Sequence, residues 1–400
     1  MHIKRKQLYV LTLSFFALVS LVYLNAKNRL ETLLHDESTL RKLPLFQLNR
    51  SSNCVPSDHI FFLKTHKCAS STVQNILMRR GFKKGLNFVL PEKGNYIGHP
   101  YFWNETKHIG KWLLAENEEY DMFVHHSRFT PDAVRRVMPN DSKWITVMRD
   151  PVAQFDSSYH YFSLGNNWLK NKSLTLKKLL SYATEDIIKM CENRVRYGYA
   201  FGHNQMAFDL GMDEEQFRNE TAIDTLVSTL TAEFDLVLVA DFMLISLVLL
   251  ADLLCWPLEQ MAFISLNTRE TSAVSELTEL ERKKILELNN VDSRLYNHFL
   301  KIFKVKIEEY GVERIEKDVM RLAAINDDLE SKCLKIEPRK TVNLSDATLH
   351  KIENIVLLPK APLYCEAFVQ KELAFTDILR WRQRKKFKIK SDLKYILNFK

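Results

Sequence analysis

The stretch HIFFLKTHKCASST, at residues 59–72, sets an apolar run, a polar loop and the start of a helix directly after one another. The run IFFL has the composition of a short buried strand. After the loop, apolar residues recur at helical spacing: Val73, Ile76 and Leu77. We expect this helix to end at Gly81, because glycine readily adopts the left-handed conformation that ends helices. A strand, a loop and a helix in this order form an anion site at the helix N-terminus.

Strand and helix patterns alternate along most of the chain. Further buried strands are predicted at 122–126 (MFVHH), 143–148 (KWITVM) and 234–242 (FDLVLVADF). Thr130 followed by Pro131 is typical of a helix N-cap and first turn. This alternation predicts a three-layer α/β domain with a mainly parallel sheet, which is P-loop-like in its opening strand, loop and helix.

Two segments later in the chain are predicted to be helical. The apolar run 242–251 is too short to cross a bilayer and is expected to be a buried helix. Residues 276–333 carry apolar stripes at helical spacing, with Gly311 as the main interruption. We therefore place a catalytic domain at 56–335, with a helical C-terminal part, and a C-terminal extension with a basic tail at 336–400.

The N-terminus has the pattern of a membrane anchor. Residues 8–24 are uncharged and mostly apolar, and basic residues precede them at 4–6. A bilayer-spanning helix needs roughly 17–25 such residues, and the segment is longer than the apolar part of a cleavable signal. We predict a type II membrane protein with a cytoplasmic stub at 1–7, a transmembrane signal-anchor at 8–24 and a lumenal stem at 25–55.

The positive charge of the chain is local. The formal net charge is +8, yet residues 380–400 alone hold nine Lys or Arg and one Asp. The remainder is therefore near neutral, which argues against a nucleic-acid-binding surface. The tail is interpreted as a solvated extension.

The loop KTHKCASST contains no glycine and is unlike a Walker loop, which needs glycines and a Lys-Ser/Thr pair for a metal-bound triphosphate. The loop does contain one lysine (Lys67) and one small residue (Ala69). Three hydroxyl residues follow at the start of the helix: Ser70, Ser71 and Thr72. Such a loop can hold one phosphate through N–H, hydroxyl and helix-dipole contacts without a metal.

A second anion site is predicted in WITVMRDPVAQFDSSYHYF, residues 144–162. Arg149 follows a strand, at the edge where ligands bind in open α/β sheets. Asp150 and Pro151 then start a helix, and Ser157 lies two turns into it. An arginine fork and a hydroxyl in these places suit a second phosphate. Two one-phosphate sites on one sheet indicate a nucleotide phosphorylated at both ends.

These two stretches, FLKTHKCASST and WITVMRDPVAQFDSSYHYF, resemble the nucleotide-binding segments of Golgi carbohydrate sulfotransferases, and most of all the galactose-3-O-sulfotransferase family. Residues 234–256 and 291–299 add to the resemblance, which spans roughly residues 59–335. It implies a sulfotransferase fold, Golgi localisation with a lumenal catalytic domain, and 3′-phosphoadenosine 5′-phosphosulfate as the sulfate donor, with no metal required. The implied acceptor is a galactose hydroxyl, the 3-hydroxyl in this family, on a glycolipid such as galactosylceramide or on a glycoprotein glycan.

The resemblance also implies roles for individual residues. Lys67 matches the lysine that contacts the bridging oxygen of the phosphosulfate. The 5′-phosphate ligands match Ser70, Ser71 and Thr72, and the 3′-phosphate ligands match Arg149 and Ser157. Cys68 departs from the family, which usually has threonine there, so a side-chain contact from this position is in question.

Sulfuryl transfer to a hydroxyl needs a base beside the acceptor oxygen and positive charge beside the leaving phosphate. Lys67 suits the second role. His126 matches a family histidine and is our candidate for the base, while the neighbouring His125 would point to the opposite side of a strand. His66 is the alternative base, and Arg128 is a further candidate for contacting the acceptor or the donor.

Three other readings remain open. A nucleotide kinase would use a similar strand, loop and helix but would need a Walker loop and Mg²⁺. A uronyl 2-O-sulfotransferase would share the donor and also carries a histidine at the position of His126. A catalytically silent lumenal glycan-binding protein would keep the fold.

Six cysteines permit up to three disulfides of unknown pairing: Cys54, Cys68, Cys191, Cys255, Cys333 and Cys365.

Overall fold

The computed structural model describes most of the chain that follows the predicted anchor. The described ranges are 54–110, 118–169, 173–192, 202–264, 275–335 and 356–397. The predicted stub, the anchor at 8–24 and nearly all of the stem lie outside these ranges. Within the described ranges, no helix combines the length and the apolar character needed to cross a membrane.

The centre of the protein is a parallel sheet of five strands in the order β2-β3-β1-β4-β5. The strands are β1 (Ile60–Leu63), β2 (Phe88–Val89), β3 (Met122–Phe123), β4 (Lys143–Met148) and β5 (Leu236–Val239). All residues of β1 and β5 are buried, as expected for a sheet that is covered on both faces. The predicted α/β fold with a mainly parallel sheet is thus confirmed.

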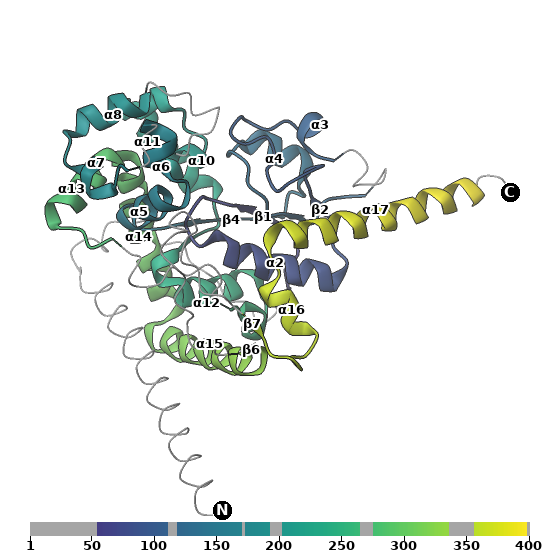
Figure 1. Cartoon of the computed structure of the whole chain (residues 1–400). Helices are drawn as coiled ribbons and strands as arrows, with labels where there is room; N and C mark the ends of the chain where they lie inside the picture. Colours follow the sequence, from purple (N-terminus) through teal and green to yellow (C-terminus); the bar gives the residue numbers. More distant parts are fainter. Residues whose placement is uncertain are drawn as a thin grey trace, which may run out of the picture.

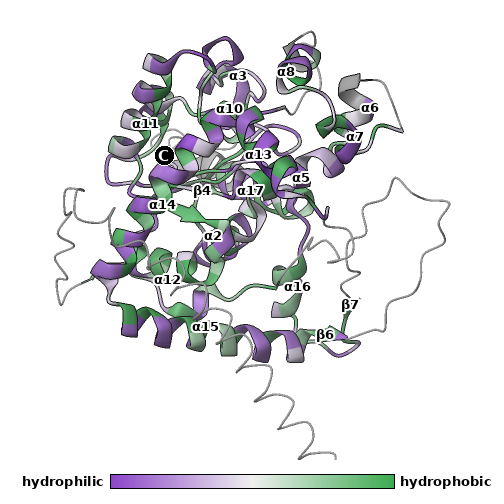
Figure 2. Cartoon of the chain, turned by 90° about the vertical axis from the view of Figure 1, so that its left-hand side faces the viewer, coloured by the Kyte–Doolittle hydropathy of each residue, from purple (hydrophilic) through white to green (hydrophobic). Residues whose placement is uncertain are grey.

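Helices cover both faces of this sheet (Figure 1). On one side lie α2 (Ser70–Lys84) and α12 (Met243–Leu254), and on the other lie α4 (Pro131–Val137) and α11 (Glu220–Glu233). The buried helix predicted at 242–251 is α12, in which eight of the twelve residues are buried. It lies against β5 and is drawn mostly in green in Figure 2.

The remaining helices and short strands of the described residues follow the chain order. They are α3 (Glu105–His108), α5 (Pro151–Tyr161), α6 (Leu164–Leu169), α7 (Leu176–Leu180), α8 (Thr184–Glu192), α10 (Gln205–Asp209), η2 (Glu214–Gln216), η3 (Ala240–Phe242), η4 (Leu258–Met261), α13 (Glu279–Leu288), α14 (Asn290–Tyr310), α15 (Val312–Cys333), β6 (Leu334–Lys335), β7 (Val356–Leu357), α16 (Tyr364–Val369) and α17 (Glu372–Leu397). The predicted helical region 276–333 is confirmed, with Gly311 between α14 and α15. Figure 2 shows purple and green alternating around α15, as in a helix that packs through one face.

The prediction that Gly81 ends α2 is wrong. The helix continues to Lys84, and Gly85 ends it in the left-handed conformation with φ 74°. Gly81 is needed for a different reason: a Cβ atom there would lie 2.3 Å from Cζ of Phe88. The absence of a side chain lets α2 pack closely onto β2.

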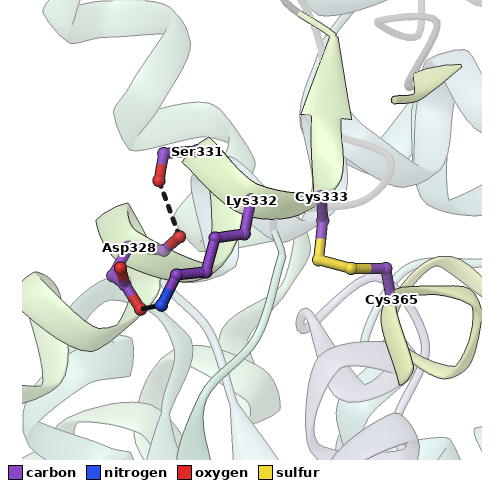
Figure 3. Close-up of a disulfide and its surroundings, with 5 residues drawn as sticks. All are labelled: Asp328, Ser331, Lys332, Cys333 and Cys365. Carbon is purple, nitrogen blue, oxygen red and sulfur yellow. Dashed lines mark hydrogen bonds and ion pairs between the residues drawn. A yellow bond between two sulfur atoms is a disulfide. The ribbon is translucent and has the colours of Figure 1, made fainter. Parts of the chain in front are cut away.

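Two disulfides fasten distant parts of the chain. Cys54 is bonded to Cys255, just after α12. Cys333, the last residue of α15, is bonded to Cys365 in α16 (Figure 3). Cys68 is a free, buried thiol. The side chain of Cys191 lies outside the described part of the chain.

Candidate active site

The loop between β1 and α2 adopts a turn that usually requires glycine. Lys67 has φ 60° and Ala69 has φ 55°, both in the left-handed region. This conformation costs roughly 1–2 kcal/mol for a residue with a side chain, so the rest of the site must hold the loop in place. Left-handed residues turn successive N–H groups inward, and the first N–H groups of a helix have no acceptor in a preceding turn. At the start of α2 the N–H of Thr72 donates to the carbonyl oxygen of Ala69, so the N–H groups before it are the ones placed to serve a ligand. The loop thus has the backbone form of an anion cradle despite having no glycine.

The hydroxyl and thiol side chains of the loop differ in their surroundings. Ser70 is buried, and its hydroxyl donates to the carbonyl oxygen of Thr65 at 2.6 Å. Ser71 is exposed and Thr72 is half-buried. Cys68 is fully buried and its thiol donates to the carbonyl oxygen of His66, while burial raises the pKa of the thiol. The side chain of Cys68 therefore faces the protein interior, and only its backbone is placed to serve a ligand.

The second predicted segment meets the first in space. Arg149 follows β4, the neighbour of β1, and its Nη1 donates to the carbonyl oxygen of Lys67 at 3.1 Å. Gln154 on α5 donates to the carbonyl oxygen of His66 at 3.1 Å. Asp150 caps α5 by accepting from the N–H of Ala153, as the sequence predicted for this helix start. The two candidate phosphate sites thus share one edge of the sheet.

Lys67 and Ser157 both lie beside α5. The ammonium group of Lys67 lies 3.4 Å from the ring centroid of Tyr161, the last residue of α5. Ser157 lies on the same helix and is buried. Among the described residues, no hydrogen bond joins Ser157 to Arg149, so their joint use of one phosphate stays a prediction.

His126 lies against the loop. Its Nδ1 donates to the carbonyl oxygen of Lys64 at 3.1 Å, since a carbonyl can only accept. Its ring stacks on that of His66, with centroids 4.1 Å apart, and on that of Tyr96 at 5.0 Å. Burial, and then the nearby His66 and Lys64, hold the pKa of His126 well below its usual range. His126 is therefore neutral, with its proton on Nδ1 and the lone pair on Nε2.

His66 is held by a carboxylate that the sequence did not single out. Both its backbone N–H and its Nδ1 lie within 2.9 Å of the carboxylate oxygens of Asp209 in α10. Its Nε2 lies 3.3 Å from the hydroxyl of Tyr96. Burial alone would raise the pKa of Asp209, but its interactions with His66, with a further contribution from His99, hold it below its usual range. Asp209 is therefore an ionised group that fixes the orientation of His66.

The same cluster has the donor atoms of a metal site. His66, His99 and Asp209 each offer one ligand atom, and these atoms lie within 4.8 Å of one another. The carboxylate of Asp209 already accepts hydrogen bonds from His66 and from Gln205. A hydrogen-bonded network accounts for the arrangement, and the expectation that no metal is required stays a prediction.

The two other candidates from this region face the interior. The strand predicted at 122–126 is wrong for its last residues, because β3 ends at Phe123 and both histidines follow it. His125 is fully buried and lies 3.0 Å from the hydroxyl of Thr376 in α17, whereas His126 contacts the carbonyl oxygen of Lys64. Arg128 is also fully buried, and its guanidinium donates to the carbonyl oxygens of Phe208 and Met212 and to Asp213. A direct contact of Arg128 with acceptor or donor is therefore not supported.

The comparisons with known proteins agree with the motifs. The family model for galactose-3-O-sulfotransferases matches residues 1–356. Galactosylceramide sulfotransferase from Bos taurus is 33% identical over 289 residues, which cover 71% of this chain and 66% of that protein. The protein of that name from Homo sapiens is also 33% identical, over 293 residues, with the same shares covered.

Galactose-3-O-sulfotransferase 2 from Sus scrofa is 30% identical over 302 residues, which cover 75% of each chain. The match spans just under two thirds of the length of the galactosylceramide sulfotransferases, at 66%. The resemblance inferred from the motifs is confirmed, and this chain belongs to the galactose-3-O-sulfotransferase family.

Proposed function

We propose that this protein transfers sulfate from 3′-phosphoadenosine 5′-phosphosulfate to the 3-hydroxyl of a galactose residue. The observation that carries the proposal is the position of His126, which lies against a loop with the form of an anion cradle although 62 residues separate it from Lys64. A base, a lysine and an anion cradle within one site match the needs of sulfuryl transfer. Family membership supports the same reaction.

The donor would be held by residues from both segments. The N–H groups of the loop and of the first turn of α2, with Ser71 and Thr72, suit the 5′-phosphosulfate. Arg149 and Ser157 are proposed for the 3′-phosphate. When bound, the donor supplies the sulfuryl group and a phosphate as leaving group. The ammonium group of Lys67 would balance the negative charge that develops on that phosphate.

The proposed base is Nε2 of His126. Its lone pair has no hydrogen-bond partner among the described residues, whereas Nε2 of His66 faces the Tyr96 hydroxyl. Burial raises the pKa of that hydroxyl, so Tyr96 keeps its proton and can donate. His126 would take the proton of the acceptor hydroxyl as the oxygen attacks sulfur. His66, oriented by Asp209, would support the stacked ring of His126.

The acceptor class is proposed from the relatives. These relatives are named for galactosylceramide or galactose, so a galactose-terminated glycolipid or glycoprotein glycan is proposed here. The setting would be the Golgi lumen, with the segment 8–24 as the type II anchor.

The experiment is a transfer assay with radiolabelled sulfate donor, using galactosylceramide and galactose-terminated oligosaccharides, followed by linkage analysis of the product. We expect sulfate on the 3-hydroxyl of galactose. His126→Ala is expected to bind adenosine 3′,5′-bisphosphate normally and to lose transfer. Sulfate on a uronic acid would favour the uronyl 2-O reaction, and glycan binding without transfer would favour the silent module.

A further inference from the structure

The most C-terminal helix contacts the proposed donor loop. α17 begins at Glu372, beyond the residues 1–356 that the family model matches and beyond the predicted catalytic domain. Figure 1 shows it, in yellow, running beside α2 and the sheet edge and then projecting from the body. Its first residue nevertheless forms an ion pair with Lys64, at the start of the loop.

Lys64 is a buried lysine: burial lowers the pKa of its ammonium group, and the carboxylate of Glu372 opposes that shift. Its side chain is 1% exposed, and its ammonium group donates to Gln74 of α2 at 2.7 Å and to the carboxylate of Glu372. Gln74 in turn donates to the carbonyl oxygen of Val124, two residues before His126. The ammonium group thus joins β1, α2, the segment after β3 and α17.

The backbone of Lys64 also holds the proposed base, because its carbonyl oxygen accepts from Nδ1 of His126. A shift of Lys64 would therefore change both the start of the loop and the orientation of the His126 ring. A buried ion pair adds little stability relative to a well-packed apolar pair. The pair of Lys64 and Glu372 is therefore better explained by the positions that it fixes than by a gain in stability.

The helix that carries Glu372 is attached to the body of the protein. The interpretation of the basic tail as a solvated extension is therefore wrong for its first residues, since Arg380 is buried and donates to the carbonyl oxygens of Pro91 and Gly94. The side chain of Gln383 bonds both the N–H and the carbonyl oxygen of Phe88 in β2, at 2.7 Å and 3.1 Å. Thr376 contacts His125, and the Cys333–Cys365 disulfide in Figure 3 ties the preceding helix α16 to α15. These contacts fix the first turn of α17 relative to the sheet.

We propose that Glu372 is a positioning residue for the donor loop: it holds the Lys64 ammonium group and thereby sets the loop and the His126 ring for sulfuryl transfer. The catalytic consequence rests on the proposed function. The contact between Glu372 of α17 and Lys64 does not depend on the proposed function. Burial alone would raise the pKa of Glu372, but the charge and hydrogen bond of Lys64, with a further hydrogen bond from Asn95, lower it, which is consistent with an ionised carboxylate.

The test compares Glu372→Gln with Asp377→Asn in the full chain. Both variants change a carboxylate to an amide on α17, but Asp377 pairs with Arg380 and its side chain is 70% exposed. Two quantities are measured: the Kd for adenosine 3′,5′-bisphosphate, and amide hydrogen exchange of residues 64–72 and 124–127. For Glu372→Gln we expect about tenfold weaker binding and faster exchange in both segments. Asp377→Asn is expected to match the wild type in both.

Wild-type binding and wild-type exchange in Glu372→Gln would overturn the proposal. If that variant does not fold, Lys64→Met/Glu372→Leu replaces the pair by apolar residues, and its exchange in the same segments is expected to be faster than in the wild type; unchanged exchange would again overturn the proposal. If the wild-type protein binds no nucleotide, the proposed function fails, while the exchange comparison still decides the role of Glu372.

Discussion

The main-chain carbonyl oxygen of Lys64 lies 3.1 Å from Nδ1 of His126 and accepts a hydrogen bond from it. This contact fixes the tautomer, since the proton must be on Nδ1 and the lone pair on Nε2. It also joins the end of β1 to the segment after β3, two neighbouring strands of the sheet. One hydrogen bond therefore sets both the loop and the proposed base.

His126→Asn tests this relationship directly. The asparagine amide can still donate to the Lys64 carbonyl, but it offers no group in place of Nε2. We expect kcat to fall by about 10²–10⁴-fold, with the Kd for adenosine 3′,5′-bisphosphate unchanged. His298→Asn is the matched control, because His298 contacts Thr231 on α11 outside the site. A His126→Asn enzyme within a few-fold of wild type would remove His126 from the role and turn attention to His66.

Arg149→Ala tests the second phosphate site. Adenosine 3′,5′-bisphosphate and adenosine 5′-monophosphate differ only in the 3′-phosphate, so the ratio of their Kd values isolates that group. We expect the wild-type preference for the bisphosphate to fall by at least about tenfold in the variant, measured by calorimetry. An equal loss of affinity for both ligands would show that Arg149 acts only by holding the Lys67 carbonyl. Arg294→Ala, which removes a surface pair with Glu220, is the control.

Metal removal tests the cluster of His66, His99 and Asp209. Because Asp209 is already occupied by hydrogen bonds, we expect sulfate transfer and thermal stability to be unchanged after dialysis against EDTA. Metal analysis of the purified protein provides a second readout. Loss of activity on chelation, restored by zinc or manganese, would show that these three residues bind an ion.

The buried His125 is expected to lower the free energy of unfolding of the protein at acidic pH. Burial lowers its pKa to about 4, against about 6.5 in the unfolded chain. Between these values the unfolded state binds more protons, so stability is present above pH 6.5 and is lost as the pH falls. His125 alone should remove about 1.5 kcal/mol of unfolding free energy between pH 6.5 and pH 5. Urea denaturation at both pH values measures this difference, and His125→Gln should show a smaller one. An equal pH dependence in the two proteins would contradict the assignment.

Gly81 within α2 and Gly85 at its C-terminal end allow the cost of overpacking to be compared with the cost of a left-handed backbone. Gly81→Ala would place a methyl group against Phe88, where we expect a cost of about 1–3 kcal/mol or more from overpacking. Gly85→Ala meets no atom within 4 Å, but it must adopt φ 74°, so about 1 kcal/mol is expected. Urea denaturation of both variants compares the costs. A larger loss for Gly85→Ala would mean that α2 adjusts easily at Gly81.

The sequence determined the local parts of this site. The run IFFL, the segment KWITVM and the Asp150–Pro151 helix start each formed the predicted element, because strand composition, helix caps and periodicity act within a few residues. The glycine-free loop and its lysine were also evident from the residue types. Family membership followed from the same stretches.

Tertiary structure decided which distant residues support these parts. Asp209 lies 143 positions from His66, and Glu372 lies 308 positions from Lys64. No local pattern marks either carboxylate as a partner, since their positions depend on strand order and on the packing of α10 and α17. Gly81 shows the same limit, because its need for glycine comes from contact with Phe88. Residue chemistry therefore predicted what the loop can bind, and long-range packing determined what holds it in place.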